Sequence, residues 1–496
     1  MGGGPFPTGA EWQALLEWTG TLADLSGTST VLGWDRETIM PAGGGEGRAK
    51  LLGTMAALSH RELMRPDGDE LLDSASASAT TPAHDRVIAL MRRERDRASR
   101  VPESLVRELS EASSRCVSTW IETRPRDDFA TFAAALSPLV ELKRRQADAL
   151  DIGDEPYDGL LDQFEPGARA AQLEVLFRDL AAGIQSLLDR VDDDAAALPE
   201  RTWPVDAQMT LASDIADLVG FERETGALAQ SAHPFTCSPH SGDVRFTTRV
   251  DSSDPMGNIL AVMHEAGHAL YEQGFPQEFA RTPLRDAPSL GAHESQSRFW
   301  ENHVGRTHAF WTHLAPTLRR LFPDAMRGVS EDDLRRGATR VHPSFIRVES
   351  DEVTYNLHIG LRFELELAMI RGDLEVADLP VAWGDRLEQL LGIRPAADGE
   401  GCMQDIHWPE GMFGYFPTYT LGNLYAAQLD AALHDHLGPT APLIERGELA
   451  PLLSFMRDRI HTQGNLRDAE ALMADATGQP LDAGPFLAHL ERSYVG

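Results

Sequence analysis

The chain has 496 residues, of which 42% are hydrophobic and 25% are charged, as in an ordinary globular protein. Acidic residues outnumber basic ones by 77 to 45, which gives a formal net charge of −32 at pH 7. Because phosphate backbones and anionic membrane surfaces attract cationic proteins, this charge excludes nucleic acids and membranes as expected partners.

The N-terminal residues 1–7 have neither a basic start nor an apolar run, so we expect no secretory signal there. No stretch of the chain reaches the roughly 18 apolar residues that a membrane span needs. The three cysteines are widely separated and lack CxxC spacing, which argues against a disulfide framework and against a thiolate metal site. These features predict a cytoplasmic protein.

Apolar residues recur three and four positions apart through most of the chain, which is the period of an amphipathic helix. The pattern predicts a mainly α-helical protein. Only short polar breaks at 74–82, 192–199 and 398–401 interrupt it, so we expect residues 1–496 to form a single unit. The predicted helices lie at about 10–25, 44–62, 84–98, 102–123, 129–149, 170–192, 207–219, 256–273, 290–314, 352–370, 376–392, 420–437, 450–462 and 484–494.

One segment, 243–250, alternates apolar and polar residues and carries β-branched side chains, so it predicts a short strand. It lies a few residues before the predicted helix at 256–273. Such a strand either has a structural role or offers a free backbone edge to an extended peptide. The pattern alone favours the structural role.

The helix at 256–273 contains an HExxH motif, His264-Glu265-Ala266-Gly267-His268. Positions i and i+4 lie one turn apart on the same helix face, so both imidazoles can bind one Zn²⁺ ion. Glu265 follows the first histidine and is placed to act as a general base on a water molecule. A random chain of this composition would contain about 0.04 such motifs, so two surface histidines by coincidence is the weaker interpretation.

A hydrolytic zinc site needs a third protein ligand and an open fourth position. Glu294 lies at the start of the next predicted helix, and its distance along the chain allows that helix to cross beside the HExxH helix. Two histidines and one glutamate suit peptide hydrolysis, because the zinc ion makes water more acidic and polarises the scissile carbonyl. A lone glutamate on a helix is usually solvated, so this assignment depends on the HExxH motif.

Six short motifs follow one another between positions 233 and 408. They are His233–Phe235, Asp243–Thr247, His264–His268, His293–Gln296, Ile346–Asp351 and Gly401–Trp408. Together they resemble the motifs of the carboxypeptidase Taq family of metallocarboxypeptidases, except that Ser350 stands where that family usually has alanine. The resemblance puts the catalytic region at about 230–425. The chain before about residue 200 carries none of these motifs, so it is assigned to the same unit only because it is continuous with the rest.

The resemblance implies a mainly α fold in which two helical lobes flank a deep substrate groove, with a small β-element near the zinc helix. It implies a carboxypeptidase that releases single amino acids from peptide C-termini with broad preference. The metal is then Zn²⁺, with Co²⁺ as an acceptable substitute, bound by His264, His268 and Glu294. By the same resemblance, Glu265 is expected to activate the water and later to pass its proton to the leaving amine, and the protein is expected to be a homodimer.

The resemblance also implies a set of hydrogen-bond donors for the developing oxyanion. His407 belongs to this set together with Tyr415 or Tyr419. The sequence does not decide which tyrosine points inward. Either one is equally well interpreted as a core aromatic with a locally satisfied hydroxyl.

A carboxypeptidase must recognise a free C-terminal carboxylate, and a guanidinium group matches its planar geometry. Arg347 is the first candidate by its motif, and Arg245 on the predicted strand is the second. The ordinary alternative for each is pairing with a structural acid such as Asp351 or Asp243. His233 is expected near the cleft, where it limits substrate length, or else it is purely structural.

Two other functions remain open at this point. The same zinc chemistry serves endopeptidases and aminopeptidases, which do not read a C-terminus. The chain could also be a zinc-bearing peptide-binding protein without turnover. The presence of Glu265 argues against the latter, because a binding site has no need of a base beside the metal.

Overall fold

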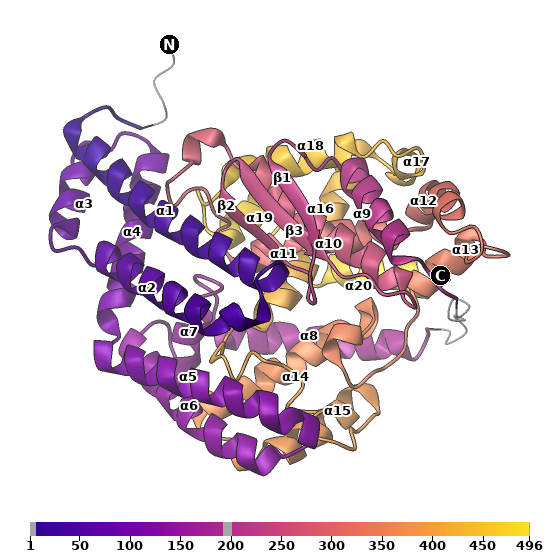
Figure 1. Ribbon diagram of the computed structural model, residues 1–496, viewed down its shortest axis with the longest axis horizontal. Helices are drawn as coiled ribbons and strands as arrows, with labels where there is room; N and C mark the ends of the chain where they lie inside the picture. The colour runs from indigo at the N-terminus through magenta and orange to yellow at the C-terminus, as the bar shows by residue number, and fades with distance from the viewer. Residues whose placement is uncertain (1–5, 192–200, 496) are drawn as a thin grey trace.

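A computed structural model describes residues 6–191 and 201–495, and it is mainly helical (Figure 1). The predicted break at 192–199 lies outside these residues. A π-helical segment, η4 (Phe299–Gly305), separates two of the helices. The α-helices are α1 (Ala10–Thr38), α2 (Gly45–Leu63), α3 (Gly68–Ser76), α4 (Pro82–Arg100), α5 (Glu103–Thr123), α6 (Phe129–Leu150), α7 (Pro156–Leu161), α8 (Ala170–Leu188), α9 (Val205–Val219), α10 (Pro255–Gly274), α11 (Leu290–Arg298), α12 (His308–Leu321), α13 (Glu331–Ala338), α14 (Glu352–Arg371), α15 (Leu379–Leu391), α16 (Pro417–Leu437), α17 (Ala441–Glu445), α18 (Ala450–Arg459), α19 (Ala469–Thr477) and α20 (Gly484–Tyr494).

Most of the predicted helices are present, but α1 is longer than predicted because it continues past Gly27. A Cβ atom added to Gly27 would lie 2.4 Å from the carbonyl oxygen of Pro239. The glycine therefore allows a close contact between α1 and the backbone near the small sheet. Glycine often ends a helix, but Gly27 does not end α1.

The prediction of one continuous helix at 290–314 is wrong. The segment forms α11, the π-helical segment η4 and then α12. Thr307 begins α12 by accepting a hydrogen bond from the backbone N–H of Phe310, as an N-cap residue does. Single π-helical turns are frequent at functional sites, because they shift the faces of the helix that follows.

The apolar periodicity does not predict α3, α7, α13 or α19, which are six to nine residues long. So few turns leave too little sequence for a helical period to be recognised. α13 nevertheless has a start signal, since Ser330 and Asp333 form a capping box.

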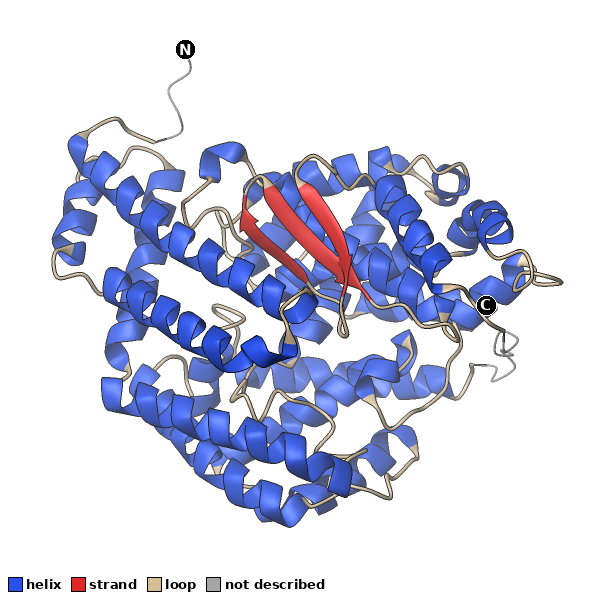
Figure 2. Ribbon diagram, in the orientation of Figure 1, coloured by secondary structure: helices blue, strands red, loops and turns tan. Residues whose placement is uncertain are grey.

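The predicted strand is β3 (Asp243–Thr248), and it lies in the middle of a three-stranded sheet (Figure 2). β1 (Gly226–Gln230) pairs with it in parallel and β2 (Thr236–His240) pairs with it antiparallel. Because both edges of β3 are paired, the hypothesis that this strand offers a free edge to a peptide is wrong. The structure supports the structural role, since Val244 and Phe246 are fully buried.

The sheet lies against α10, the helix that carries the HExxH motif. This arrangement confirms the expected mainly α fold with a small β-element near that helix. Buried apolar side chains form one large cluster, which includes those of α10, α11, α14 and α16, and a smaller cluster around α1, α3 and α4. Among the described helices, none has the length and apolar character needed to cross a membrane.

α10 and α11 approach each other closely at Gly267, inside the HExxH motif. A Cβ atom at this position would lie 2.5 Å from the carbonyl oxygen of Gln296 and 2.6 Å from the Cα atom of Ser297. Both contacts are with backbone atoms, which cannot move aside as a flexible side chain can. A glycine at position 267 therefore permits the approach of the two helices.

We expect Gly267→Ala to lower the free energy of unfolding by about 1–3 kcal/mol, the usual cost of overpacking. Urea denaturation followed by circular dichroism measures this change. Gly53→Ala is the matched control, because Gly53 is exposed on α2 and nothing lies within 4 Å of its Cβ position. Alanine there is expected to be neutral or slightly stabilising. Equal effects of the two substitutions would contradict the packing argument.

Candidate metal centre and active site

The three predicted metal ligands come together in the structure. His264 and His268 project from one face of α10, and Glu294 projects from α11. The Nε2 atom of His268 lies 3.4 Å from Oε2 of Glu294, and Nε2 of His264 lies 3.8 Å from the same oxygen. One ligand atom from each residue lies within 4.8 Å of the others. Zinc bonds of about 2.0–2.2 Å place neighbouring ligand atoms roughly 3.3 Å apart, so this group fits a zinc ion.

The protonation states of these groups also suit a cation. Burial lowers the pKa of His268 to about 4, so its imidazole is neutral and keeps a lone pair. Burial alone would raise the pKa of Glu294, but the charges of Arg298 and His264 outweigh it and hold this pKa well below the usual range. Arg298 donates from Nε to Oε1 of Glu294 at 2.6 Å. Arg298 therefore orients the carboxylate through Oε1, and Oε2, which also accepts a hydrogen bond from Oγ of Ser297 at 3.2 Å, faces the two histidines.

Each predicted histidine ligand has an outer hydrogen-bond partner that the sequence analysis did not identify. Nδ1 of His264 lies 2.9 Å from Oε2 of Glu301. Nδ1 of His268 lies 2.7 Å from Nδ1 of His293, whose Nε2 lies 3.1 Å from Oε1 of Glu272. If Nε2 of His268 binds metal, its Nδ1 carries the proton, so His293 accepts at Nδ1 and donates from Nε2 to Glu272. Such partners fix the tautomer and the orientation of a ligand histidine.

A spacing signal for the two outer carboxylates is present in the sequence. Glu272 lies four positions after His268 on α10, and Glu301 lies seven positions after Glu294. The interval of four keeps Glu272 beside His268 on one face of α10. The interval of seven is about two helical turns from Glu294, although the residue that Glu301 contacts is His264 of α10.

We expect His293→Ala to weaken the affinity of this centre for Zn²⁺ by about 10–100-fold, the usual effect of removing an outer partner. Competition with a chromogenic chelator measures the dissociation constant without any enzyme assay. His308→Ala is the matched control, because His308 is exposed at the start of α12. Unchanged affinity in His293→Ala would show that the hydrogen bond between the two imidazoles has no role in metal binding.

Glu265 is buried, at 7% exposure, and its side chain is bound by the small sheet. Thr236 of β2 donates from Oγ1 to Oε2 of Glu265 at 2.7 Å. Burial raises the pKa of Glu265, and the hydrogen bond from Thr236 and the charge of His264 act against this rise. One oxygen of the carboxylate is thus held by β2, which leaves the other for a water molecule or a substrate. No motif in the sequence points to Thr236.

His407 and the two candidate tyrosines form one cluster. The rings of His407 and Tyr415 have their centroids 5.3 Å apart, and Nε2 of His407 lies 3.2 Å from the hydroxyl of Tyr419. Burial and the charge of Glu294 raise the pKa of Tyr415 to about 12, so this hydroxyl keeps its proton. Burial and the charge of Arg347 lower the pKa of His407 to about 3, so its imidazole is neutral.

The structure relates both tyrosines to Glu294, one of the predicted metal ligands. Tyr419 lies three positions before Gly422 on α16, and a Cβ atom at Gly422 would lie 2.4 Å from Cγ of Glu294. The charge of Glu294 also contributes to the raised pKa of each tyrosine. Tyr419 is engaged with His407, whereas Tyr415 packs against the ring of Phe164 at 5.2 Å.

Arg347 is buried at 6% exposure and pairs with an acid other than the one expected. Its Nε and Nη2 atoms donate to Oδ1 of Asp405 at 3.1 and 2.8 Å. Its Nη1 donates to the hydroxyl of Tyr355 at 3.1 Å. Asp351, the partner suggested by proximity in sequence, instead caps the start of α14.

Tyr355 connects Arg347 to Glu294, one of the predicted metal ligands, through Arg298. The guanidinium of Arg298, which binds Glu294, lies 4.7 Å from the ring centroid of Tyr355. A guanidinium has five N–H donors, and the contacts of Arg347 use three of them. Two N–H groups therefore remain on a buried arginine within reach of the same region.

The other two candidates for substrate binding have different surroundings. Arg245 is partly exposed and forms a two-point ion pair with Asp243, at 2.7 and 2.6 Å. This is the alternative interpretation that the sequence allowed. His233 is exposed in the turn before β2, and its carbonyl accepts a hydrogen bond from the hydroxyl of Ser231.

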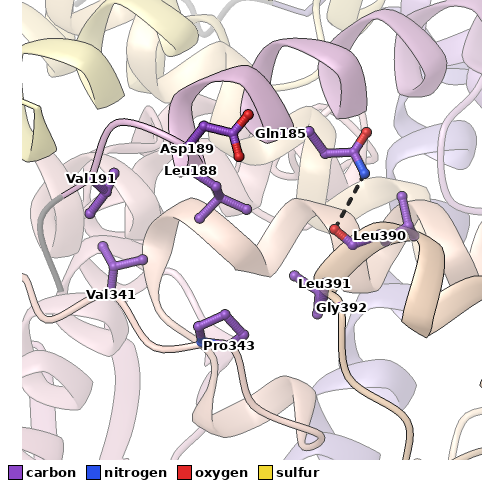
Figure 3. Close-up of a pocket in the computed structure, with 9 residues that line it drawn as sticks. All are labelled: Gln185, Leu188, Asp189, Val191, Val341, Pro343, Leu390, Leu391 and Gly392. Atoms are coloured by element: carbon purple, nitrogen blue, oxygen red, sulfur yellow. Dashed lines mark hydrogen bonds between the residues drawn. The ribbon is translucent and has the colours of Figure 1, made fainter.

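A separate hollow of about 540 Å³ lies between the end of α8 and the end of α15 (Figure 3). Gln185 donates across it to the backbone carbonyl of Leu390 at 3.4 Å. None of the residues that line it is a predicted site residue.

Comparison with known proteins places these features in context. A family model described as carboxypeptidase Taq (M32) metallopeptidase matches residues 14–494. Thermostable carboxypeptidase 1 of Thermus thermophilus is 42% identical over an alignment of 503 positions, which covers 98% of each chain. Carboxypeptidase 1 of Bacillus subtilis is 34% identical, with 93% of each chain covered.

Solved structures give the same result. The crystal structure of an M32 carboxypeptidase from Deinococcus radiodurans R1 matches with a TM-score of 0.95 and 36% identity, over 98% of this chain and 99% of that one. Metallocarboxypeptidase 1 of Trypanosoma cruzi matches with a TM-score of 0.94 and 31% identity, over 98% and 99% of the two chains.

Proposed function

Because the chain belongs to the carboxypeptidase Taq (M32) family and is a metallocarboxypeptidase, we propose that it is zinc-dependent and that His264, His268 and Glu294 hold the metal. The observation that carries this proposal is the convergence of two imidazole nitrogens and one carboxylate oxygen within 4.8 Å of one another. Nitrogen and carboxylate donors in this ratio suit Zn²⁺, and Co²⁺ accepts the same donors. A bound zinc ion supplies Lewis acidity, which acidifies water and polarises a carbonyl group.

We propose that Glu265 moves the proton during hydrolysis. Its free oxygen accepts a proton from the attacking water and then gives it to the nitrogen of the leaving amino acid. The hydrogen bond from Thr236 at 2.7 Å keeps the carboxylate in one orientation during both transfers. Its burial among α10 and the sheet supports this role, because burial raises the pKa of a carboxyl group toward that of a useful base.

We propose that His407, Tyr415 and Tyr419 donate hydrogen bonds to the carbonyl oxygen as negative charge develops on it. The neutral state of His407 and the raised pKa of Tyr415 both leave protons available for donation. Of the two tyrosines, Tyr415 is the better donor to a substrate, because Tyr419 already contacts His407.

Recognition of the C-terminal carboxylate is assigned to Arg347. It is buried, it keeps two free N–H groups, and Tyr355 links it to the partner of Glu294. Arg245 is a weaker candidate because it is only partly buried and its guanidinium pairs with the neighbouring Asp243 on the same strand. His233, which is exposed, is proposed to act at most at the mouth of the groove.

Several broader features are carried over from the resemblance. We propose one metallopeptidase unit over residues 1–496, with a catalytic region at about 230–425 and a groove between two helical lobes that takes peptides. A broad preference for the released residue, a homodimeric assembly and a cytoplasmic location belong to the same proposal. The free thiols of Cys116, Cys237 and Cys402 support a reducing compartment.

The zinc proposal is tested on one unblocked peptide. Protein stripped with a chelator should be inactive, and added Zn²⁺ or Co²⁺ should restore a ladder of products that lose C-terminal residues, seen by mass spectrometry. His264→Gln and Glu294→Gln should not be restored. Activity that survives complete removal of the metal would overturn the proposal. Internal fragments would favour an endopeptidase, and tight peptide binding without cleavage would favour a binding protein.

A further inference from the structure

A second group of metal-ligand side chains lies in the core, outside the site described above. His303 comes from η4, Asp430 from α16 and His489 from α20. One ligand atom from each lies within 4.8 Å of the others. The three residues are only 6%, 7% and 8% exposed. Three elements that are far apart in sequence thus bring two imidazoles and a carboxylate together away from solvent.

The spacing within this group fits a shared cation better than a hydrogen bond. Nδ1 of His303 lies 3.4 Å from Oδ2 of Asp430, and among the described residues it has no hydrogen-bond partner of acceptable geometry. Nε2 of His268 and Oε2 of Glu294, in the first site, are also 3.4 Å apart. A buried nitrogen without a partner is costly, so its presence points to a ligand.

The outer partners have the form that usually surrounds metal ligands. Nε2 of His489 lies 2.9 Å from Oε1 of Glu352, and the hydroxyl of Tyr494 donates to Oε2 of the same carboxylate at 2.6 Å. If Nε2 donates to Glu352, Nδ1 of His489 keeps its lone pair. A carboxylate behind a histidine in this way fixes the tautomer that a metal requires.

Charge and burial agree with this interpretation. Burial and the neighbouring His489 lower the pKa of His303, so its imidazole is neutral. Asp430 supplies one negative charge, and its other oxygen lies 3.4 Å from Nδ1 of His434. Two imidazoles with a single carboxylate favour a borderline transition metal over Ca²⁺ or Mg²⁺, which prefer sets of oxygen ligands.

We propose that His303, Asp430 and His489 bind a second divalent metal ion, zinc by preference, which fastens the C-terminal helix α20 to α16 and to the π-helical segment. Substrate cannot reach ligands this deeply buried, so the role of the ion is structural. The same π-helical segment carries Glu301, which supports His264 of the first site. The second ion therefore stabilises the backbone from which the first site is organised.

The test is a metal count on the full chain. Wild-type protein is saturated with Zn²⁺, and gel filtration removes the excess. Inductively coupled plasma emission spectroscopy should then show two zinc ions per chain. His489→Gln and His303→Gln should each contain one and should keep peptide hydrolysis. His264→Gln should also contain one but should lose hydrolysis. Tyr494→Phe is the matched control, since it removes an outer hydrogen bond and no ligand, and it should keep both ions.

One zinc ion per wild-type chain would overturn the proposal, as would two ions in both His303→Gln and His489→Gln. Crystals of the zinc-loaded wild type provide a measurement that needs no variant to fold. Anomalous difference maps at the zinc edge should show a peak among His303, Asp430 and His489. A peak at His264 and His268 alone would refute the second site and leave the first intact.

Discussion

Glu265→Gln is expected to reduce peptide hydrolysis by about 10²- to 10⁴-fold, the usual contribution of a general base. Glutamine has nearly the same shape, and its carbonyl oxygen can still accept the hydrogen bond from Thr236. It cannot accept a proton from water at neutral pH. Because Glu265 is not one of the three ligands, the zinc content should stay at the wild-type level. Steady-state kinetics on an unblocked peptide measures the rate of hydrolysis. Inductively coupled plasma emission spectroscopy measures the zinc content.

Glu278→Gln is the matched control, because Glu278 is exposed just beyond the end of α10. It should leave both kcat and the zinc content unchanged. Near-normal turnover in Glu265→Gln would refute the proposed base. Loss of zinc together with activity would show that the residue acts by holding the site in place, and the proton transfers would then need another group.

The HExxH spacing predicts the central part of this site because it is local. Residues four apart on a helix share a face, so the convergence of His264 and His268 follows once the helix at 256–273 is recognised. The same rule reaches Glu272, four positions after His268, which the sequence analysis passed over. Helical periodicity therefore predicts residues of this site beyond those of the HExxH motif.

Partners that come from distant segments could not be predicted in the same way. Arg347 pairs with Asp405, 58 positions away, and not with the nearby Asp351. The contact of Thr236 with Glu265 requires a strand too short for a clear alternating pattern. These contacts depend on how helices and strands dock, and docking is decided by packing of the whole core.

The fold shows the same division between local and distant information. Long amphipathic helices are predicted, whereas β1 and β2 are not, since each has five residues and mixed polarity. The group of His303, Asp430 and His489 depends entirely on contacts between distant segments. No two of its members belong to the same helix, so no spacing in the sequence indicates it.

Arg347→Ala is expected to lower kcat/KM for peptides with a free C-terminus by roughly 10²-fold, the size expected when a charge-assisted hydrogen bond is lost. Peptides with an amidated C-terminus carry no carboxylate to recognise, so their slow cleavage should change much less. The ratio of the two rates is the informative quantity, because a general disturbance of the site would lower both. Arg347→Lys keeps the positive charge but loses the planar guanidinium that can donate two parallel hydrogen bonds. Its preference for free over amidated C-termini should therefore lie between those of the wild type and of Arg347→Ala.

Arg245→Ala separates the two candidate arginines. Arg245 is partly exposed on β3 and is not the proposed carboxylate binder, so its removal should leave the preference for free carboxylates unchanged. Removal of Arg347 leaves Asp405 paired with Arg362, which donates to it from Nε at 2.7 Å, so the buried aspartate is not left alone. Thermal denaturation should therefore show a folded Arg347→Ala protein. Equal losses on free and amidated peptides in that folded protein would mean that Arg347 is structural and that the carboxylate is read elsewhere.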